Sequence, residues 1–331
     1  MKNIFHFIAA AMLTACMAGC NAQQGVETPV EKTVRTTVRI EGSAETRATG
    51  VTAAQEESIQ NLQIFVFDEN GAKEFYINAG ASRTGDVVTK EGKMTVMAVV
   101  NAPDLESVTS RNALLTKTTL LSDNSLGSMV MTGEVEAVLQ DGGSISIPVT
   151  RIISKVMIKK ITSSFTSTTN ANKEFRVKSI YLLNVAGDNT YSATSEPTIW
   201  YNKLQDGYND TACRSFGLLS DSVNTTIPFK SSYTADHSFY CYPNLISQES
   251  FDATWCPRHT MLVIDTTLGS DRVYYPIELP VIGRNKCIII EELVITKKGS
   301  DQPYKPVEDG SCSVTVQVVP WDVILDYTET I

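Results

Sequence analysis

Residues 33–49 read TVRTTVRIEGSAETRAT, and the first half of this stretch alternates between two kinds of side chain. One face of an extended chain carries Val34, Thr36, Val38 and Ile40, with charged or polar residues between them. Alternation with a period of two is typical of a β-strand that is buried on one face only. The small residues after this run end the pattern. We therefore predict a half-buried strand near the start of the chain.

The segment after this strand carries one basic residue, Arg47, which is followed by Ala48. Small and polar residues surround Arg47, and such a sequence is typical of an exposed segment that proteases reach. The predicted strand is thus joined to the rest of the chain by a segment that is open to cleavage.

The composition favours a globular all-β protein. The 331 residues are 42% apolar and 20% charged, with a net charge of −9. A chain of this length has room for two domains. Long helical patterns are scarce, whereas threonine, serine and valine are abundant. The acidic balance argues against nucleic acid as a partner, because phosphate binding needs clustered lysine and arginine.

The N-terminus has the features of an export signal. Lys2 precedes an apolar run over residues 4–15, and Met17-Ala18-Gly19-Cys20 follows. Small residues directly before a cysteine resemble the lipobox of bacterial lipoproteins, in which the cysteine receives a lipid. We predict a lipoprotein signal peptide over 1–19 and lipidation of Cys20. The alternative is an ordinary signal peptide with an incidental cysteine.

The rest of the chain consists of short strand-like runs separated by turn residues. These runs cover 59–67, 75–77, 94–100, 135–139, 145–149, 154–161, 175–185, 238–242, 261–265, 273–279 and 287–295. The two runs on either side of Asp141-Gly142-Gly143 are predicted to form a hairpin. A new strand and a polar loop begin after residue 152. We therefore predict two β-sandwich domains in tandem, over 48–152 and 153–331.

The tail, residues 311–331, carries two more alternating runs. Val314, Val316 and Val318 alternate with polar residues in the first run. Pro320 and Trp321 interrupt the pattern. The second run supplies three further apolar side chains at period two, namely Val323, Leu325 and Tyr327.

Several stretches together resemble the fimbrillin family, the pilins of the type V pili of Bacteroidales. These stretches are the signal, the early strand ending near Arg47, IFVFDENG (64–71), VVNAP (99–103), IPVTRIISKVMI (147–158), FYCYPN (239–244), IGRNKCIIIEELVI (282–295) and SVTVQVVPW (313–321). The resemblance implies two transthyretin-like β-sandwich domains. It also implies an outer-membrane lipoprotein precursor from which an Arg-specific protease removes residues 20–47 by cutting between Arg47 and Ala48.

In this reading the strand with Val34, Val38 and Ile40 is displaced, and the tail of another copy replaces it. The side chains of the donor would be Val314, Val316, Val318, Val323, Leu325 and Tyr327. We expect a surface fimbrium that serves adhesion and colonisation, with this chain in its stalk. A tip or accessory subunit remains an alternative, because the tail could simply complete its own sheet.

Enzymatic and metal-dependent functions find little support in the sequence. It contains no GxSxG, HExxH, P-loop or GxGxxG motif, so we expect no enzyme and no cofactor. One arrangement with zinc-like spacing is His237, Cys241, Cys256 and His259. Residues four apart on a strand lie over about 13 Å from each other, which argues against a shared metal.

The five cysteines beyond the signal are Cys213, Cys241, Cys256, Cys287 and Cys312. Their odd number leaves at least one without a partner in the chain, and whether any pair forms a disulfide stays open. Trp200 and Tyr201 follow a proline in a predicted loop and suggest a contact surface. A glycan-binding outer-membrane lipoprotein is therefore a further alternative.

Overall fold

The computed structural model describes residues 32–42, 55–205, 208–209, 217–246, 249, 255–307 and 312–321. The strands belong to one compact unit, Thr33–Ile331. The helices among the described residues are short: α2 (Arg111–Thr116), the 3-10 turn η1 (Leu121–Asp123) and α3 (Thr168–Ala171). None of them has the length and apolar character needed to cross a membrane. The all-β prediction is confirmed.

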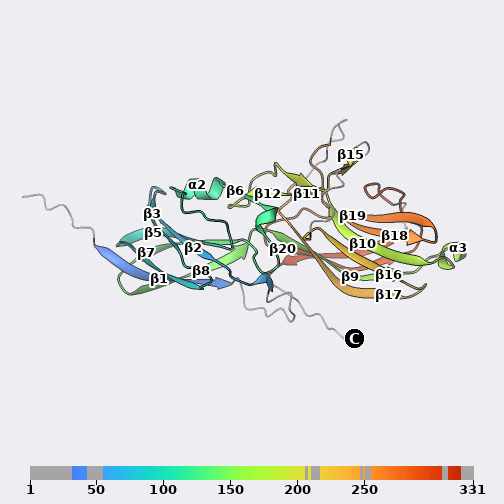
Figure 1. The fold of residues 1–331 in the computed structure, drawn as a ribbon, viewed down its shortest axis with the longest axis horizontal. Helices are drawn as coiled ribbons and strands as arrows, with labels where there is room; N and C mark the ends of the chain where they lie inside the picture. The colour runs from blue at the N-terminus through green and yellow to red at the C-terminus, as the bar shows by residue number, and fades with distance from the viewer. Residues whose placement is uncertain are drawn as a thin grey trace, which may run out of the picture. The chain divides into compact units, whose positions relative to one another are not determined.

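The described part of the chain up to Arg151 forms a seven-stranded sheet. Its strands are β1 (Thr33–Gly42), β2 (Leu62–Phe67), β3 (Lys73–Asn78), β4 (Thr84–Lys90), β5 (Gly92–Val100), β7 (Met131–Leu139) and β8 (Gly143–Arg151). They run in the order β3-β2-β5-β7-β8-β1-β4, and β1 is the blue strand in Figure 1. The predicted first strand is therefore confirmed, and it lies inside this sheet.

The remaining strands form two four-stranded sheets and three short ribbons. These strands are β6 (Thr118–Leu120), β9 (Ser154–Ser163), β10 (Phe175–Leu183), β11 (Val185–Ala186), β12 (Asp188–Thr190), β13 (Trp200–Tyr201), β14 (Leu204–Gln205), β15 (Tyr208–Asn209), β16 (Ser220–Thr226), β17 (Ser232–Cys241), β18 (Met261–Leu268), β19 (Asp271–Glu278), β20 (Lys286–Ile295) and β21 (Cys312–Pro320). The larger sheets have the orders β16-β10-β18-β19 and β17-β9-β20-β21. Strand β8 belongs to the seven-stranded sheet, whereas β9 belongs to one of the four-stranded sheets. The division into two domains stays a prediction.

Strand β2 is buried on both faces, because it separates two hydrophobic clusters. Leu62, Ile64 and Val66 pack with the apolar residues of β1, whereas Phe65 and Phe67 pack on the opposite side. A continuous apolar run is the pattern expected of a strand without a solvent-facing side. The β2 sequence thus fixes one wall of the core that β1 completes.

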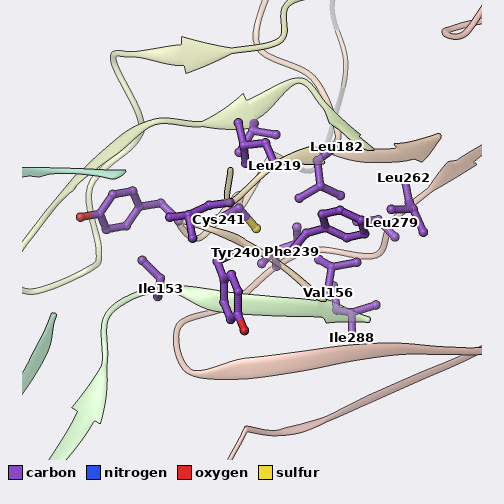
Figure 2. Packing of buried hydrophobic residues seen from close by; sticks show 14 of the residues in the cluster. Ile153, Val156, Leu182, Leu219, Phe239, Tyr240, Cys241, Leu262, Leu279 and Ile288 are labelled. Carbon is purple, nitrogen blue, oxygen red and sulfur yellow. The ribbon is translucent and has the colours of Figure 1, made fainter. Parts of the chain in front are cut away.

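The second cluster continues into the sheets that follow β8. It combines residues of β9, β10, β17, β18 and β20. In Figure 2 the ring of Phe239 points toward Leu262 and Leu279, whereas the ring of the next residue, Tyr240, points away from them. Cys241 is fully buried in this cluster and acts there as a small apolar residue.

The predicted hairpin over 135–149 is wrong in its pairing. Strands β7 and β8 pair only at Met131 with Arg151 and at Thr132 with Thr150, far from the turn that joins them. Nearer the turn, β8 pairs with β1 instead. Strand β8 lies between β7 and β1 in the sheet order, and most of its length pairs with β1.

Candidate strand-exchange site

Strand β1 is hydrogen-bonded along both of its edges. It runs antiparallel to β4 from Thr33, opposite Lys90, to Arg39, opposite Thr84. It runs parallel to β8 from Thr36, opposite Gly143, onward. A strand with two partners has its backbone N–H and C=O groups satisfied on both sides. Strand β1 is therefore an interior strand of the sheet, although it comes first in the chain.

The inward face of β1 is completely covered. Val34, Val38 and Ile40 are at most 2% exposed and pack against residues of β2, β4 and β8. Thr36 lies on the same face, and its hydroxyl donates a 2.9 Å hydrogen bond to the carbonyl of Gln140. The predicted inward face is confirmed, and the one polar residue in it has a backbone acceptor.

The outward face of β1 contributes weaker contacts. The Thr37 hydroxyl donates a 2.9 Å hydrogen bond to Asp86, and the Arg35 guanidinium lies 3.6 Å from the same carboxylate. Both side chains of this ion pair are at least half exposed, and such pairs add little stability. Burial and the two ladders therefore hold β1 in place.

Without β1, the sheet would have a groove between β4 and β8. Its walls would be two strand edges with unpaired backbone groups, and its floor would be the apolar residues that now contact β1. Such a groove accepts an extended segment with alternating apolar side chains.

The first alternating run of the tail is strand β21, at the end of its sheet. It pairs antiparallel with β20 on one edge only. The Val316 and Val318 side chains are 38% and 49% exposed, and Val314 is half-buried. A β-bulge between Ile290 and Glu292 interrupts the register opposite them. Strand β21 is thus an edge strand that leaves much of its apolar alternation unburied.

One residue anchors the end of β21. Trp321 is 5% exposed, and its indole Nε1–H donates a 3.2 Å hydrogen bond to the carboxylate of Glu56. The guanidinium of Arg151 lies 4.5 Å from the centre of the indole ring, and the Tyr240 ring stacks at 5.7 Å. Trp321 thus anchors the end of the strand through burial, one hydrogen bond and two ring contacts.

The same Glu56 collects three further hydrogen-bond donors. Lys155 Nζ and the Tyr240 hydroxyl each lie 2.6 Å from its carboxylate, and Arg151 donates to its backbone carbonyl at 3.2 Å. Burial and the adjacent Glu56 carboxylate raise the pKa of Tyr240, so its hydroxyl stays a donor. We call Glu56, Arg151, Lys155, Tyr240 and Trp321 the Glu56 cluster.

The comparisons with known proteins point to one family. A family model described as major fimbrial subunit protein (FimA) matches residues 33–194, which contain β1 and its partners β4 and β8. The fold resembles that of a fimbrilin (FimA) from Porphyromonas gingivalis W83, with a TM-score of 0.58 and 17% identity over 87% of this chain and 97% of that chain. Over residues 33–194 the chain is similar to the fimbrillin family.

Two further solved structures resemble this chain in fold. A Bacteroides eggerthii protein, provisionally described as a cell adhesion protein, has a TM-score of 0.66 and 19% identity over 88% of this chain and 97% of that chain. The tip fimbrial protein Mfa3 of P. gingivalis, with a C-terminal truncation, has a TM-score of 0.55 and 12% identity over 88% and 100% of the two chains. No curated protein matches the sequence.

Like Glu56, Arg284 was not singled out from the sequence, and it fixes the far end of β8. Its guanidinium donates hydrogen bonds to the backbone carbonyls of Thr132, Thr150 and Arg151 and to both threonine hydroxyls, at 2.6–3.2 Å. Burial lowers the pKa of Arg284. Close by, an added Cβ at Gly133 would lie 2.1 Å from the Pro148 carbonyl oxygen, so glycine is required where β7 approaches β8. Arg284 thus holds one wall of the site to the segment before β20.

Several predicted site residues fall outside the part of the chain that the structure describes. They are Cys20, Arg47, Ala48, Val323, Leu325, Tyr327 and Cys213. Their proposed roles stay predictions.

The arrangement with zinc-like spacing does not form a site. His237 is held by Asp221 at 2.6 Å and by the Tyr233 hydroxyl at 2.9 Å, whereas His259 contacts Glu278 at 2.6 Å. Among the described residues, no group of histidine, cysteine and carboxylate side chains could hold a metal ion. Of the described cysteines, Cys241, Cys287 and Cys312 are free thiols.

Proposed function

We propose that this chain is a fimbrial subunit that polymerises by strand exchange after cleavage at Arg47. Cleavage between Arg47 and Ala48 severs β1 from the rest of the chain, and the tail of a second copy then takes its place between β4 and β8. The observation that carries this proposal is the position of β1, which is first in sequence yet paired on both edges.

The loss of β1 would leave the subunit unstable alone. Fully burying a valine or isoleucine contributes about 1.5–3 kcal/mol, so Val34, Val38 and Ile40 contribute on the order of 5–9 kcal/mol. The two ladders add further hydrogen bonds, each at about 1 kcal/mol net. A replacement strand would recover much of this free energy.

The tail would form more backbone hydrogen bonds and bury more apolar surface in the groove than it does in its own sheet. On β20 it has one ladder, and Val316 and Val318 stay substantially exposed. Between β4 and β8 it would have two ladders, and its valines would take positions where β1 side chains are fully buried. The exchange is therefore favourable, and slow withdrawal of the strand would keep the polymer intact.

A stalk subunit must both accept a strand and donate one, and this chain has the elements for both steps. A tip position is the second candidate, because β21 pairs with β20 as the last strand of its own sheet. The two differ in outcome: a stalk subunit forms long polymers after cleavage, whereas a tip subunit accepts one neighbour and stops.

We propose that export and lipid anchoring of the precursor precede assembly. Lipid on Cys20 would hold the precursor in the outer membrane until an Arg-specific protease releases it into a surface fimbrium that serves adhesion. Metabolic labelling with a fatty acid tests this step. The wild-type precursor should carry the label, and Cys20→Ala should lose both the label and the surface fibre. Label retained in the variant would place the lipid elsewhere.

Trypsin treatment of purified precursor tests the exchange. Wild-type precursor should form polymers whose subunits begin with Ala48, whereas Arg47→Ala should form none. In the tail, Val316→Asp should prevent extension by placing a charge in the groove. Gln317→Asp is the matched control, because the adjacent residue faces the opposite side of the strand. Normal polymerisation of Val316→Asp would exclude β21 as the donor.

A further inference from the structure

Strand β21 is stored in its own sheet, and the contacts that keep it there are concentrated at one end. Most residues of Cys312–Pro320 are exposed or half-buried, and the strand has one hydrogen-bonded edge. Trp321 is the buried exception, held by its backbone N–H to the Asn285 carbonyl at 3.0 Å and by its side chain to Glu56. Release of the tail therefore requires that Trp321 leave the Glu56 cluster.

The position of Glu56 in the sequence links this anchor to the cleavage segment. Glu56 is the first buried residue after β1 among the residues that the structure describes. Residues 43–55 connect it to Gly42, the end of β1, and Arg47 lies within that connection. Glu56 thus lies nine positions after Arg47, so cleavage there would place it close to a new N-terminus.

The contacts of Glu56 also explain how a change on its N-terminal side reaches Trp321. Its Oε2 accepts the Trp321 indole N–H, and its Oε1 accepts from Lys155 and Tyr240. Arg151 contacts both sides of the pair, through the Glu56 carbonyl and the face of the Trp321 ring. A displacement of the Glu56 backbone therefore moves the carboxylate that accepts the indole N–H. It also moves the Arg151 guanidinium that lies over the indole ring.

We propose that the Glu56 cluster is an autoinhibitory contact that keeps the donor strand on β20 until the chain is cut after Arg47. This inference rests on the proposed function, since it assigns the regulation of the same strand exchange. Cleavage has two effects in this account: it frees the acceptor groove and it weakens the anchor of the donor. A subunit then becomes competent to accept and to donate at the same step.

Hydrogen–deuterium exchange of the monomeric full-length protein tests the proposal. Peptides that cover residues 312–321 should exchange slowly in the uncleaved wild type. Trp321→Phe keeps a ring and removes only the indole donor to a charged acceptor, and it should raise exchange in these peptides by about tenfold or more. Tyr240→Phe removes another donor to Glu56 and should act in the same direction. Monomer collected directly after trypsin cleavage should also exchange faster than the precursor.

Trp255→Phe is the matched control. It removes an indole N–H that donates to Asn184 at 3.3 Å, away from the tail, so peptides 312–321 should exchange as in the wild type. Unchanged exchange in both Trp321→Phe and Tyr240→Phe, or unchanged exchange after cleavage, would overturn the autoinhibitory contact. Polymer formation by cleaved wild type is scored separately by electron microscopy. Its absence would overturn the proposed function, whatever the exchange rates.

Discussion

The hydroxyl of Thr36 donates a 2.9 Å hydrogen bond to the carbonyl of Gln140 and thereby joins β1 to the turn between β7 and β8. Thr36 is 1% exposed and stands in line with Val34 and Val38 on the inward face. The bond is the specific polar contact on a face that is otherwise held by apolar burial. It also lies on the strand whose removal is the first step of the proposed assembly.

Thr36→Val should destabilise the uncleaved precursor by about 1 kcal/mol, the net value of one hydrogen bond. Urea unfolding measures the change. Thr37→Val is the control, because Thr37 faces outward and its hydroxyl contacts the exposed Asp86. The control should stay within about 0.5 kcal/mol of wild type. Equal losses in both variants would contradict an inward-facing role of Thr36.

Arg284→Met should destabilise the protein by about 3 kcal/mol, because it removes the donor to the part-buried carbonyls of Thr132 and Thr150. Arg111→Met is the comparison. Arg111 forms a bidentate pair with Glu134, but both side chains are about 40% exposed, so its loss should cost less than about 1 kcal/mol. Similar losses for the two variants would mean that Arg284 adds only an ordinary surface contact.

Glu292 lies opposite β21 at the bulge, and its contribution to the free energy of unfolding depends on pH. A 2.5 Å hydrogen bond from the Thr162 hydroxyl, followed by Lys160 at 3.1 Å, lowers the pKa of Glu292. The folded state therefore binds fewer protons than the unfolded state. The stabilisation is present above the ordinary glutamate pKa and is lost as the pH falls through the lowered value.

Glu292→Gln should thus cost about 0.5–1 kcal/mol at pH 7, with allowance for the partial exposure of the pair, and less as the pH falls through the lowered pKa. Denaturant unfolding over a series of pH values measures it. Thr162→Val should remove part of the same effect, and the double variant should lose no more than Glu292→Gln alone. A loss that is independent of pH would contradict this assignment.

The thiols report where β21 lies. Burial raises the pKa of Cys241 to about 12 and that of Cys287 to about 11, and it also raises the pKa of Cys312 on β21. At pH 8 few of these thiols are thiolates, which are the reactive form. Alkylation followed by peptide mapping should leave Cys241 and Cys287 unmodified in the precursor. Cys312, which is half-buried on an edge strand, should react first, and fast alkylation of Cys241 would contradict its place in the core.

Much of the strand content follows from the sequence, since strands with clear apolar runs or alternation, such as β1, β2, β5 and β20, form as predicted. Strands β4 and β16 were not predicted, because TGDVVTK and SDSVNTT carry many polar residues and little alternation. They are strands because neighbours pair with them, and those neighbours are distant in sequence. Tertiary context decides such segments, and local pattern does not.

At the candidate site, too, the sequence predicts some features, whereas others depend on tertiary contacts. The alternation of Val34, Val38 and Ile40 identifies the inward face of β1, but not the parallel pairing with β8 that makes it an interior strand. Glu56 stands in a polar run with no pattern of its own, and its role depends on Trp321, 265 positions away. Contacts of that separation leave no periodic signal in a single sequence.

The most direct test of the account is a photo-crosslinking measurement on β8. A benzophenone side chain in place of Ser144, which is exposed and lies opposite Thr37 of β1, reports which strand occupies the groove. In the precursor, the crosslinked peptide identified by mass spectrometry should come from residues 33–42 of the same chain. In the polymer formed after cleavage, it should come from residues 311–331 of a second subunit. Crosslinks that stay on residues 33–42 in the polymer, or that join Ser144 to a different segment, would contradict exchange of β1 for the tail.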